Sequence, residues 1–245
     1  MSPRDRARRY FEHVLATLRD WRSQAIGSAG LCALCGAPST GMDLCSGCRA
    51  DLPCIETACA RCAVPLPMGA GSLCAQCLIK PPSFDSALCP YRYEAPLSGL
   101  IKKLKYHGQL AAGRLLGQLL VEVVRARAEP LPDVLIPVPL HQTRLRARGF
   151  NQSHELALPI ARALDLPVQP QLVERRYATA SQSSLGAAKR RRNVRGAFAA
   201  TAPSPPNVVI VDDVMTTGCT ADELARVLRK AGAQSVRVWA LARAR

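Results

Sequence analysis

Four Cys-x-x-Cys pairs lie close together in the first third of the chain, and they constrain its fold more than any other feature. The pairs are Cys32 and Cys35, Cys45 and Cys48, Cys59 and Cys62, and Cys74 and Cys77. Two thiolates separated by two residues can bind the same tetrahedral ion, and two such pairs complete a four-sulfur zinc site. Because such a site has no open position for water or substrate, we predict two structural zinc ions.

The spacing between the pairs leaves the grouping of the ligands open. Nine residues separate the first pair from the second, and eleven separate the third from the fourth, which is enough for a hairpin within each group. We predict two sequential sites, with a cross-braced arrangement of first with third and second with fourth pairs as the alternative. Disulfides are disfavoured because the rest of the chain has a cytosolic character. Cys54, Cys89 and Cys219 are expected to be packing or loop residues.

The cysteine-rich segment is one of three predicted parts of the chain. Tandem prolines at Pro81 and Pro82 stop any helix or strand directly after it. We predict an amphipathic helical lead-in over residues 1–30, a double zinc-ribbon module over residues 31–80 and a larger domain over residues 81–245. Of the 245 residues 48% are hydrophobic, so the larger domain can bury a core, which excludes a disordered or fibrous protein.

Positive charge is concentrated in the larger domain. The formal net charge is +15, of which +2 belongs to residues 1–100 and +13 to residues 101–245. Such a surplus favours a polyanionic partner. No stretch approaches the roughly 18 to 20 consecutive apolar residues that span a bilayer, and the N-terminus lacks the apolar core of a signal peptide. We therefore predict a cytoplasmic protein with no transmembrane segment.

The first 30 residues carry an apolar stripe. Phe11, Val14, Leu15, Leu18 and Trp21 recur at three- and four-residue spacing opposite a basic face, which predicts a short amphipathic helix within residues 4–28. We favour packing of this stripe on the rest of the protein. The alternative is a peripheral attachment to the inner face of the membrane.

Apolar runs in the larger domain predict a parallel sheet. Strands are expected at residues 134–136, 208–211 and 236–241, because such short apolar runs are typical of strands buried on both faces. A helix at residues 221–231 would complete a right-handed strand, loop, helix, strand unit. Further elements are expected as an extended stretch at residues 87–93 and helices from about residue 96 and at residues 110–128. The polar, arginine-rich residues 140–152 and 177–198 are expected to be loops.

The most specific stretch is VVIVDDVMTTGCT, at residues 208–220. Here the predicted buried strand ends in two adjacent carboxylates, Asp212 and Asp213. They suit the vicinal hydroxyls of a ribose, from which they can accept hydrogen bonds beside a magnesium ion. Two alternatives would explain the pair of acids. They could cap the loop that follows, or they could form an acidic pocket of the kind found in receiver domains.

A loop of hydroxyl residues follows the two acids and leads into the predicted helix. Backbone N–H groups at a helix start attract a phosphate, and Gly218 permits its close approach. The hydroxyls of Thr216, Thr217 and Thr220 add donors. The loop therefore predicts a phosphate site next to the sugar site.

This stretch resembles the phosphoribosyl pyrophosphate motif of type I phosphoribosyltransferases. Together with the cysteine pairs, other segments resemble the ComF family from about Cys32 to the C-terminus: FD at residues 84–85, YRY at 91–93, LKYHG at 104–108, IPVPL at 136–140, RGFNQ at 148–152 and RNVRGAF at 192–198. That family is associated with uptake of single-stranded DNA during natural transformation. The implied fold is α/β, a type I phosphoribosyltransferase-like parallel sheet with flanking helices, preceded by a small double zinc-ribbon module.

The resemblance also implies roles for individual residues. Asp212 and Asp213 would be the catalytic acids that hold the ribose hydroxyls. The remaining phosphoribosyl-binding residues would be Thr216, Thr217, Gly218, Cys219 and Thr220, and the residues facing pyrophosphate would be Arg146, Arg148 and Gly149. Residues 182–192 would form a flexible hood loop that closes over the substrate. Cys219 and Met215 depart from the residues common at their positions in the motif.

The implied ligands are phosphoribosyl pyrophosphate and magnesium, in addition to two structural zinc ions. As an enzyme, the protein would be a pentosyltransferase, a phosphoribosyltransferase whose acceptor no motif in the sequence identifies. The alternative is a non-enzymatic module that binds single-stranded DNA through its basic surface and retains the fold and ligand pocket. A helicase or a channel component of DNA uptake is a further candidate partner.

Overall fold

The computed structural model describes residues 30–177 and 194–244 of the chain. The predicted N-terminal helix and the predicted hood loop at residues 182–192 lie outside these residues. The chain divides into two compact units, one ending at Arg49 and the other beginning at Ala50. The boundaries predicted at residues 30 and 80 stay predictions.

In the first unit, residues 30–49 form a segment rich in turns. A β-bridge joins Leu31 and Pro38, and the backbone N–H of Cys32 donates to the carbonyl of Ala37 over 2.7 Å. The short helix α2 (Ser46–Ala50) lies at the end of this segment. Among the described residues of this unit only Cys32 and Leu44 are buried, which is too little apolar surface for a core. Metal binding, on the order of 10 kcal/mol or more per zinc, supplies stability of this kind in small domains.

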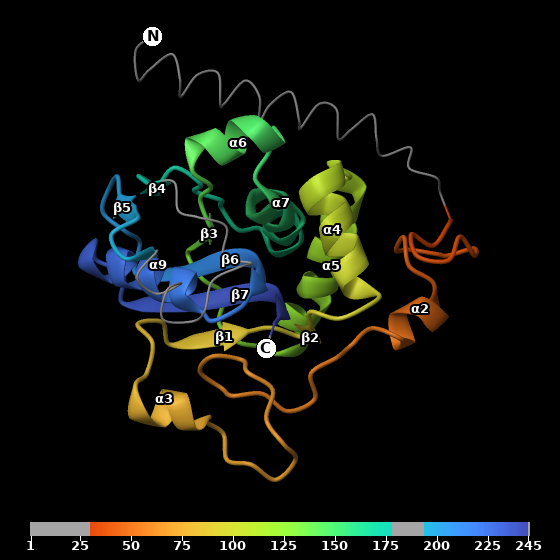
Figure 1. Ribbon diagram of the computed structural model, residues 1–245, viewed down its shortest axis with the longest axis horizontal. Coiled ribbons are helices and arrows are strands. Elements are labelled where there is room, and N and C mark those ends of the chain that lie inside the picture. The colour runs from red at the N-terminus through yellow and green to blue at the C-terminus, as the bar shows by residue number, and fades with distance from the viewer. Residues whose placement is uncertain (1–29, 178–193, 245) are drawn as a thin grey trace. The chain divides into compact units, whose positions relative to one another are not determined.

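The second unit is built around a parallel sheet. Its strands are β1 (Ser86–Leu88), β2 (Tyr91–Arg92), β3 (Val134–Pro137), β6 (Asn207–Met215) and β7 (Ser235–Arg243). The order is β1-β7-β6-β3, with β2 also beside β7, and all these pairs are parallel. The three predicted strands are therefore confirmed, and β6 and β7 lie at the centre of the sheet (Figure 1).

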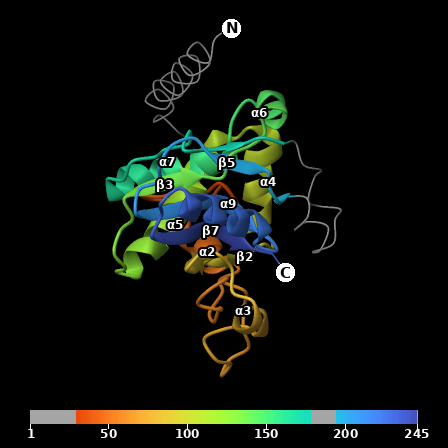
Figure 2. The ribbon, with the colours of Figure 1, turned by 90° about the vertical axis from the view of Figure 1, so that its left-hand side faces the viewer.

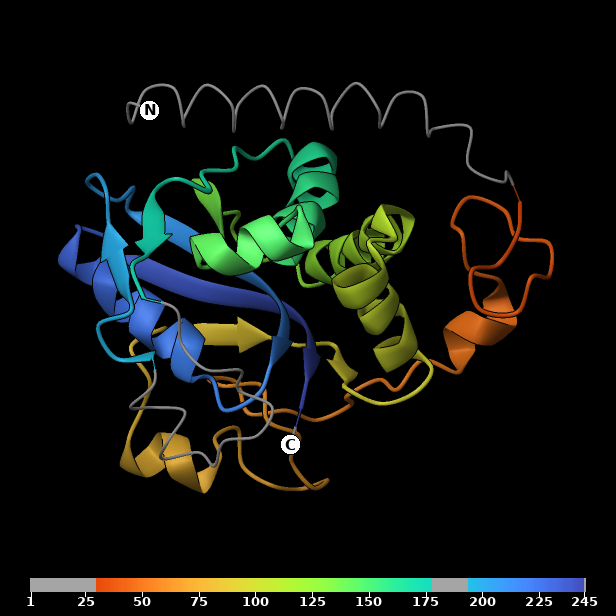
Figure 3. The same ribbon diagram turned by 45° about the horizontal axis from the view of Figure 1, so that its top comes forward.

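Helices cover both faces of this sheet. They are α4 (Leu97–His107), α5 (Leu110–Ala126), α7 (Gln152–Leu164) and α9 (Cys219–Lys230). The helices α5 and α7 pack on each other and on the sheet, with α4 against α5, while Figure 3 shows α4 and α5 (yellow-green) away from α9 (blue). Nowhere in the described part of the chain is a helix both long and apolar enough to cross a membrane.

Alternate side chains of β6 point to opposite faces of the sheet. Val208 and Ile210 belong to one apolar cluster with Leu224 and Leu228 of α9. Because side chains alternate along a strand, the buried residues between them point to the face covered by α5 and α7. Both faces of β6 are therefore apolar, which explains the uninterrupted run of aliphatic residues in the sequence.

The strand β6 is longer than the sequence predicted. It continues through Asp212 and Asp213 to Met215, because β7 pairs with it as far as Met215 and Arg243. The helix α9 begins at Cys219, so the connecting loop has only three residues. The acids therefore lie within the paired strand and not at its end.

Both segments that were predicted to be loops contain regular structure. In the first, α6 (Gln142–Arg148) is capped by His141, whose Nδ1 accepts a hydrogen bond from the N–H of Thr143 over 3.3 Å. The prediction was wrong here because a capped surface helix needs no apolar stripe. In the second, Phe198 begins β5 (Phe198–Ala200), which pairs antiparallel with β4 (Val173–Arg175).

The second cysteine segment packs against the sheet within the second unit. The N–H of Ile55 donates to the carbonyl of Pro90 over 2.8 Å, and the N–H of Arg92 donates to that of Pro53 over 2.7 Å. Ala63 is buried in the same apolar cluster as the sheet. Figure 2 shows the short helix α3 (Ala75–Ile79) and the loop before it extending away from β2 and β7. The knuckle around Ala63 is therefore part of the core of this unit.

Candidate functional site

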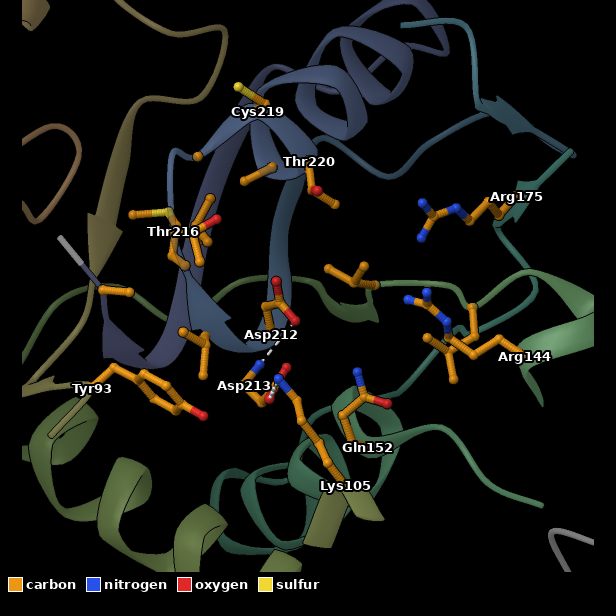
Figure 4. A pocket seen from close by; sticks show the side chains of 18 of the residues that line it. Tyr93, Lys105, Arg144, Gln152, Arg175, Asp212, Asp213, Thr216, Cys219 and Thr220 are labelled. Atoms are coloured by element: carbon orange, nitrogen blue, oxygen red, sulfur yellow. Dashed lines mark hydrogen bonds and ion pairs between the residues drawn. The ribbon is translucent and has the colours of Figure 1, made fainter. Parts of the chain in front are cut away.

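A cavity of about 350 Å³ opens at the carboxyl ends of β3 and β6. Open parallel sheets bind ligands at this edge, and the volume suits a small phosphorylated metabolite. Figure 4 shows most of its side chains. The lining consists of Tyr93, Lys105, Tyr106, Val138, Leu140, Arg144, Arg148, Gln152, Arg175, Asp212, Asp213, Val214, Met215, Thr216, Gly218, Cys219, Thr220, Ala221, Val238 and Ala244.

The two predicted acids meet inside this cavity. The hydroxyl of Ser153, at the start of α7, donates to Oδ1 of Asp212 over 3.1 Å. The N–H of Asp213 donates to the same oxygen over 2.9 Å. Burial, and after it the charge of Asp213, raises the pKa of Asp212 to about 8. Two full negative charges are therefore unfavourable here unless a cation or the donors of a ligand compensate them.

Lys105 reaches the acids from the last turns of α4. Its ammonium group forms an ion pair with Asp213, whose side chain is 3% exposed (Figure 4). Burial lowers the pKa of Lys105, but the charge of Asp213, the hydrogen bond to it and the charge of Asp212 together raise the pKa overall. Lys105 is therefore a fixed positive charge at the acids.

No role for Lys105 was predicted from the sequence, although a signal was present. The buried residues of α4 are apolar and share one face of the helix: Leu97, Leu100, Ile101 and Leu104. Lys105 lies four residues after Ile101, which is on the same face. A lysine at a core-facing position is rare unless it has a charged partner.

The loop between β6 and α9 lies at the other end of the cavity from α6. Gly218 is the N-cap of α9 with φ of 76°, a left-handed conformation that favours glycine. Thr216, Gly218, Cys219 and Thr220 line the cavity. The first N–H groups of a helix have no partners within the helix, and its dipole favours an anion at this end. The start of α9 therefore offers backbone donors to an anion at this end of the cavity.

Among the predicted phosphate-binding residues at positions 216–220, Thr217 alone does not line the cavity. Its hydroxyl donates to the sulfur of Cys219 over 3.1 Å. Cys219 itself is 7% exposed. This contact holds the two side chains together at the start of α9.

Arginines supply positive charge across the cavity from the loop. Arg144 comes from α6 and Arg175 from β4, and Figure 4 shows both on the side away from Thr216. Arg148, also from α6, donates to the side-chain oxygen of Gln152. This distribution places cations at one end of the cavity and a helix start at the other, so two separate anionic groups can be bound.

The placement of the predicted arginines follows from the helical structure of α6. Arg148 lines the cavity, as does Arg144, because residues four apart share a helix face. Arg146 is exposed and does not line the cavity, and Gly149 is the C-cap of α6, also outside the lining. Arg144 was noted in the sequence only as part of an arginine-rich loop. Its role depends on a helix that was not predicted.

The cysteines form two compact clusters, and the grouping is sequential. In each cluster the four sulfur atoms lie within 4.8 Å of one another, and the members are Cys32, Cys35, Cys45 and Cys48 in one and Cys59, Cys62, Cys74 and Cys77 in the other. None of the eleven cysteines, all within the described residues, forms a disulfide. The cross-braced alternative is therefore excluded.

The sulfur geometry fits tetrahedral zinc. The sulfur atoms of Cys35 and Cys45 are 3.7 Å apart, and those of Cys62 and Cys74 are also 3.7 Å apart. Zinc–sulfur bonds of about 2.3 Å place tetrahedral ligands roughly 3.8 Å apart. With four sulfurs per ion, the two sites are structural.

Elemental analysis of the purified protein should give two zinc ions per chain. Replacing Cys32 and Cys35 together by serine should reduce the content to one, because a pair of ligands is lost from one cluster only. Replacing Cys54, which is exposed and outside both clusters, should leave two. A wild-type content clearly below two would contradict the ligand assignment.

Comparison with known proteins matches both parts of the chain. A family model described as a double zinc ribbon domain matches residues 29–78. A second model, described as a phosphoribosyl transferase domain, matches residues 151–245. The first range includes all eight clustered cysteines, and the second includes β6, the loop and α9.

Relatives match most of the chain. "DNA utilization protein YhgH" of Escherichia coli K12 is 39% identical over 226 residues, covering 87% of this chain and 97% of the relative. "Competence protein F" of Haemophilus influenzae is 37% identical over 209 residues, covering 82% and 90%. "Amidophosphoribosyltransferase" of E. coli K12 is 30% identical over 164 residues, covering 66% of this chain and 30% of that protein. The chain therefore belongs to the ComF family, and it joins a double zinc ribbon to a phosphoribosyltransferase-like domain.

Proposed function

We propose that this protein binds phosphoribosyl pyrophosphate together with magnesium in the cavity at the carboxyl ends of β3 and β6. The observation that carries the proposal is the meeting of two acids with a glycine loop at a helix start, opposite three arginines. Phosphoribosyl pyrophosphate carries a phosphate on one side of its ribose and pyrophosphate on the other. Its binding therefore needs the acids between the helix start and the arginines.

Each part of the ligand has a matching part of the cavity. The ribose hydroxyls donate to Asp212 and Asp213, which hold their carboxylates in the cavity. The 5-phosphate lies against the N–H groups of the loop and the first turn of α9. The pyrophosphate faces Arg144, Arg148 and Arg175, since guanidinium groups bind phosphate oxygens through paired hydrogen bonds.

Magnesium fits the chemistry of these donors. Carboxylate oxygens are ligands that Mg²⁺ prefers, and it is usually held by one or two of them together with substrate phosphates. Asp212 and Asp213 would hold the ion beside the ribose. When bound, the ion neutralises charge on the pyrophosphate. The ion pair of Asp213 with Lys105 provides part of this compensation before the ligand arrives.

The reaction this site suits is transfer of the phosphoribosyl group to a nitrogen nucleophile. The bond from C1 of the ribose to pyrophosphate breaks, a bond from C1 to nitrogen forms, and pyrophosphate leaves with the electron pair. The arginines of α6 and β4 stabilise the departing charge, and the acids hold the sugar in position. The acceptor is to be found by screening nitrogen nucleophiles for pyrophosphate release.

The names of the relatives connect the family to DNA. We extend to this chain the role in DNA utilization and competence that those names state. A cytoplasmic location and contact with a helicase or a channel component of DNA uptake belong to the same proposal. The net charge of +13 that the chain carries over residues 101–245 agrees with a polyanionic partner.

Isothermal titration calorimetry tests the central proposal. Phosphoribosyl pyrophosphate should bind one site per chain in the presence of magnesium, and omission of magnesium should weaken binding. Ribose 5-phosphate and pyrophosphate should each compete, because each occupies part of the cavity. Absence of binding with magnesium present would overturn the proposal.

Binding of single-stranded DNA is the second candidate function, and one contact favours it. Tyr106 is 71% exposed, and the guanidinium of Arg148 lies 5.9 Å from the centre of its ring. An exposed aromatic ring beside a cation can stack a base next to the cavity. DNA binding that persists when Asp212 and Asp213 are replaced by asparagine would show that DNA and phosphoribosyl pyrophosphate bind at different sites. Competition with phosphoribosyl pyrophosphate would place both ligands in one site.

A further inference from the structure

One side chain connects the second cysteine cluster to the loop at residues 216–218, which joins β6 to α9. Arg243 is the last residue of β7, and its Nε donates to the carbonyl of Cys62 over 3.1 Å. Its Nη1 donates to the carbonyl of Met215 over 3.1 Å and also to the carbonyl of Thr216. A single guanidinium therefore joins the backbone of a cluster cysteine to the backbone of the loop.

The burial and charge of Arg243 set it apart from a surface arginine. The residue is 8% exposed, and its side chain donates to backbone carbonyls, including that of Ala244 over 2.7 Å. Within residues 30–177 and 194–244 it forms no ion pair with a carboxylate. A buried cation is costly unless fixed dipoles or charges compensate it, so carbonyl oxygens must stay in place around it. The guanidinium and the two backbone segments therefore constrain one another.

Packing reinforces the same connection. Ala63, directly after Cys62, is 2% exposed and belongs to the apolar cluster that includes Met215 and Cys219. The N–H of Ala244 donates to the carbonyl of Met215 over 3.0 Å, which fixes the end of β7 against the loop. The cysteine knuckle and the loop thus share both a core and a hydrogen-bonding side chain.

We propose that Arg243 is a positioning residue through which metal bound at the second cysteine cluster fixes the loop 216–218. Metal holds the knuckle around Cys62 in its folded shape, since zinc-ribbon segments depend on the ion for their structure. The carbonyl of Cys62 then holds Arg243, and Arg243 holds the carbonyls of Met215 and Thr216. The part of this inference that concerns ligand affinity rests on the proposed function.

Hydrogen exchange measured by mass spectrometry on the full-length protein tests the connection without any ligand. Replacing Arg243 by methionine, or Cys77 by serine, should speed exchange in peptides covering residues 214–219 by about tenfold, because the loop loses its anchor. The matched control is Cys48→Ser, which removes a ligand from the first cluster, in the other compact unit. This control should leave the same peptides unchanged.

The affinity for phosphoribosyl pyrophosphate, measured by calorimetry, should fall about tenfold in Arg243→Met and Cys77→Ser and stay unchanged in Cys48→Ser. Faster loop exchange in Arg243→Met and Cys77→Ser than in the wild type, together with no binding of phosphoribosyl pyrophosphate by the wild type, would support the positioning role and overturn the proposed function. Unchanged loop exchange in both variants, with unchanged exchange at β3 as the check of folding, would overturn the positioning role. If Arg243→Met fails to fold, Arg243→Lys decides, and wild-type loop exchange in that variant would count against the role.

Discussion

Replacing Asp212 and Asp213 together by asparagine should weaken binding of phosphoribosyl pyrophosphate with magnesium by at least about a hundredfold. A carboxylate offers only acceptors to the two ribose hydroxyls, whereas an amide presents donors on one side. The double change also removes the negative charge that, in the proposed complex, would hold magnesium beside the sugar. Calorimetric titration of the wild type and the variant under the same conditions measures the effect.

The ion pair of Lys105 with Asp213 complicates the double variant. The asparagine at position 213 leaves the ammonium of Lys105 partly buried without its partner, and breaking a buried pair can cost about 3–5 kcal/mol. The single variant Asp212→Asn avoids this cost because it retains the pair. Its affinity should still fall about tenfold, since one charge-assisted hydrogen bond is lost.

A matched control is available at the opposite end of the same strands. Asp133 precedes β3, and its Oδ2 accepts a hydrogen bond from the N–H of Asn207 over 2.8 Å at the start of β6. Asp133→Asn makes the same chemical change away from the cavity and should leave binding unchanged. Wild-type affinity in the double variant would show that these acids do not hold the ribose.

The sequence was sufficient to predict the presence of β6, its loop and α9, although not the full length of β6, because each is defined by local signals. Four consecutive aliphatic residues predict a strand buried on both faces, and the hydroxyl residues around Gly218 predict the loop that follows it. The apolar spacing of α9 predicts its buried face. These signals depend on neighbouring residues alone, so no knowledge of the rest of the chain was needed.

The basic wall of the cavity could not be predicted in the same way. Arg175 reaches the cavity because β4 pairs with β5, and both strands are only three residues long. Arg144 depends on α6, which is held by a histidine cap and has no buried residues. Such elements are fixed by contacts between distant segments and carry little hydrophobic periodicity of their own.

The cysteine clusters illustrate the same division. Spacing along the chain favoured a sequential grouping but left the cross-braced one open, and the sequential grouping is the one observed. The packing of the second knuckle against the sheet depends on Ala63, a small residue whose burial nothing in its neighbourhood indicates. The contact of Arg243 with Cys62 likewise joins residues far apart in the sequence.

Replacing Gly117 by alanine should lower the free energy of unfolding by about 1–3 kcal/mol. A Cβ at this position of α5 would lie 2.2 Å from Cγ of Pro159 and 3.0 Å from the carbonyl oxygen of Leu156, both in α7. A proline ring and a backbone oxygen cannot rotate away, so the two helices would have to separate. Urea denaturation followed by circular dichroism, with zinc present throughout, measures the loss.

Gly99→Ala in α4 is the matched control, because nothing lies within 4 Å of its added Cβ. Alanine should stabilise that helix by about 0.5–1 kcal/mol. Gly113→Ala should fall between the two, since its Cβ would meet the flexible side chain of Leu104 at 3.2 Å. Wild-type stability in Gly117→Ala would contradict the close approach of α5 and α7.

Gly117→Ala should also weaken ligand binding in the cavity, because residues at the start of α7 hold parts of the site. Ser153 donates to Asp212, and Asn151, the N-cap of α7, donates to the carbonyl of Val138 over 3.0 Å. A displacement of α7 away from α5 moves these contacts, whereas Gly99→Ala does not. Weaker binding of phosphoribosyl pyrophosphate in Gly117→Ala than in Gly99→Ala would therefore show that the α5 and α7 contact sets the position of the acids.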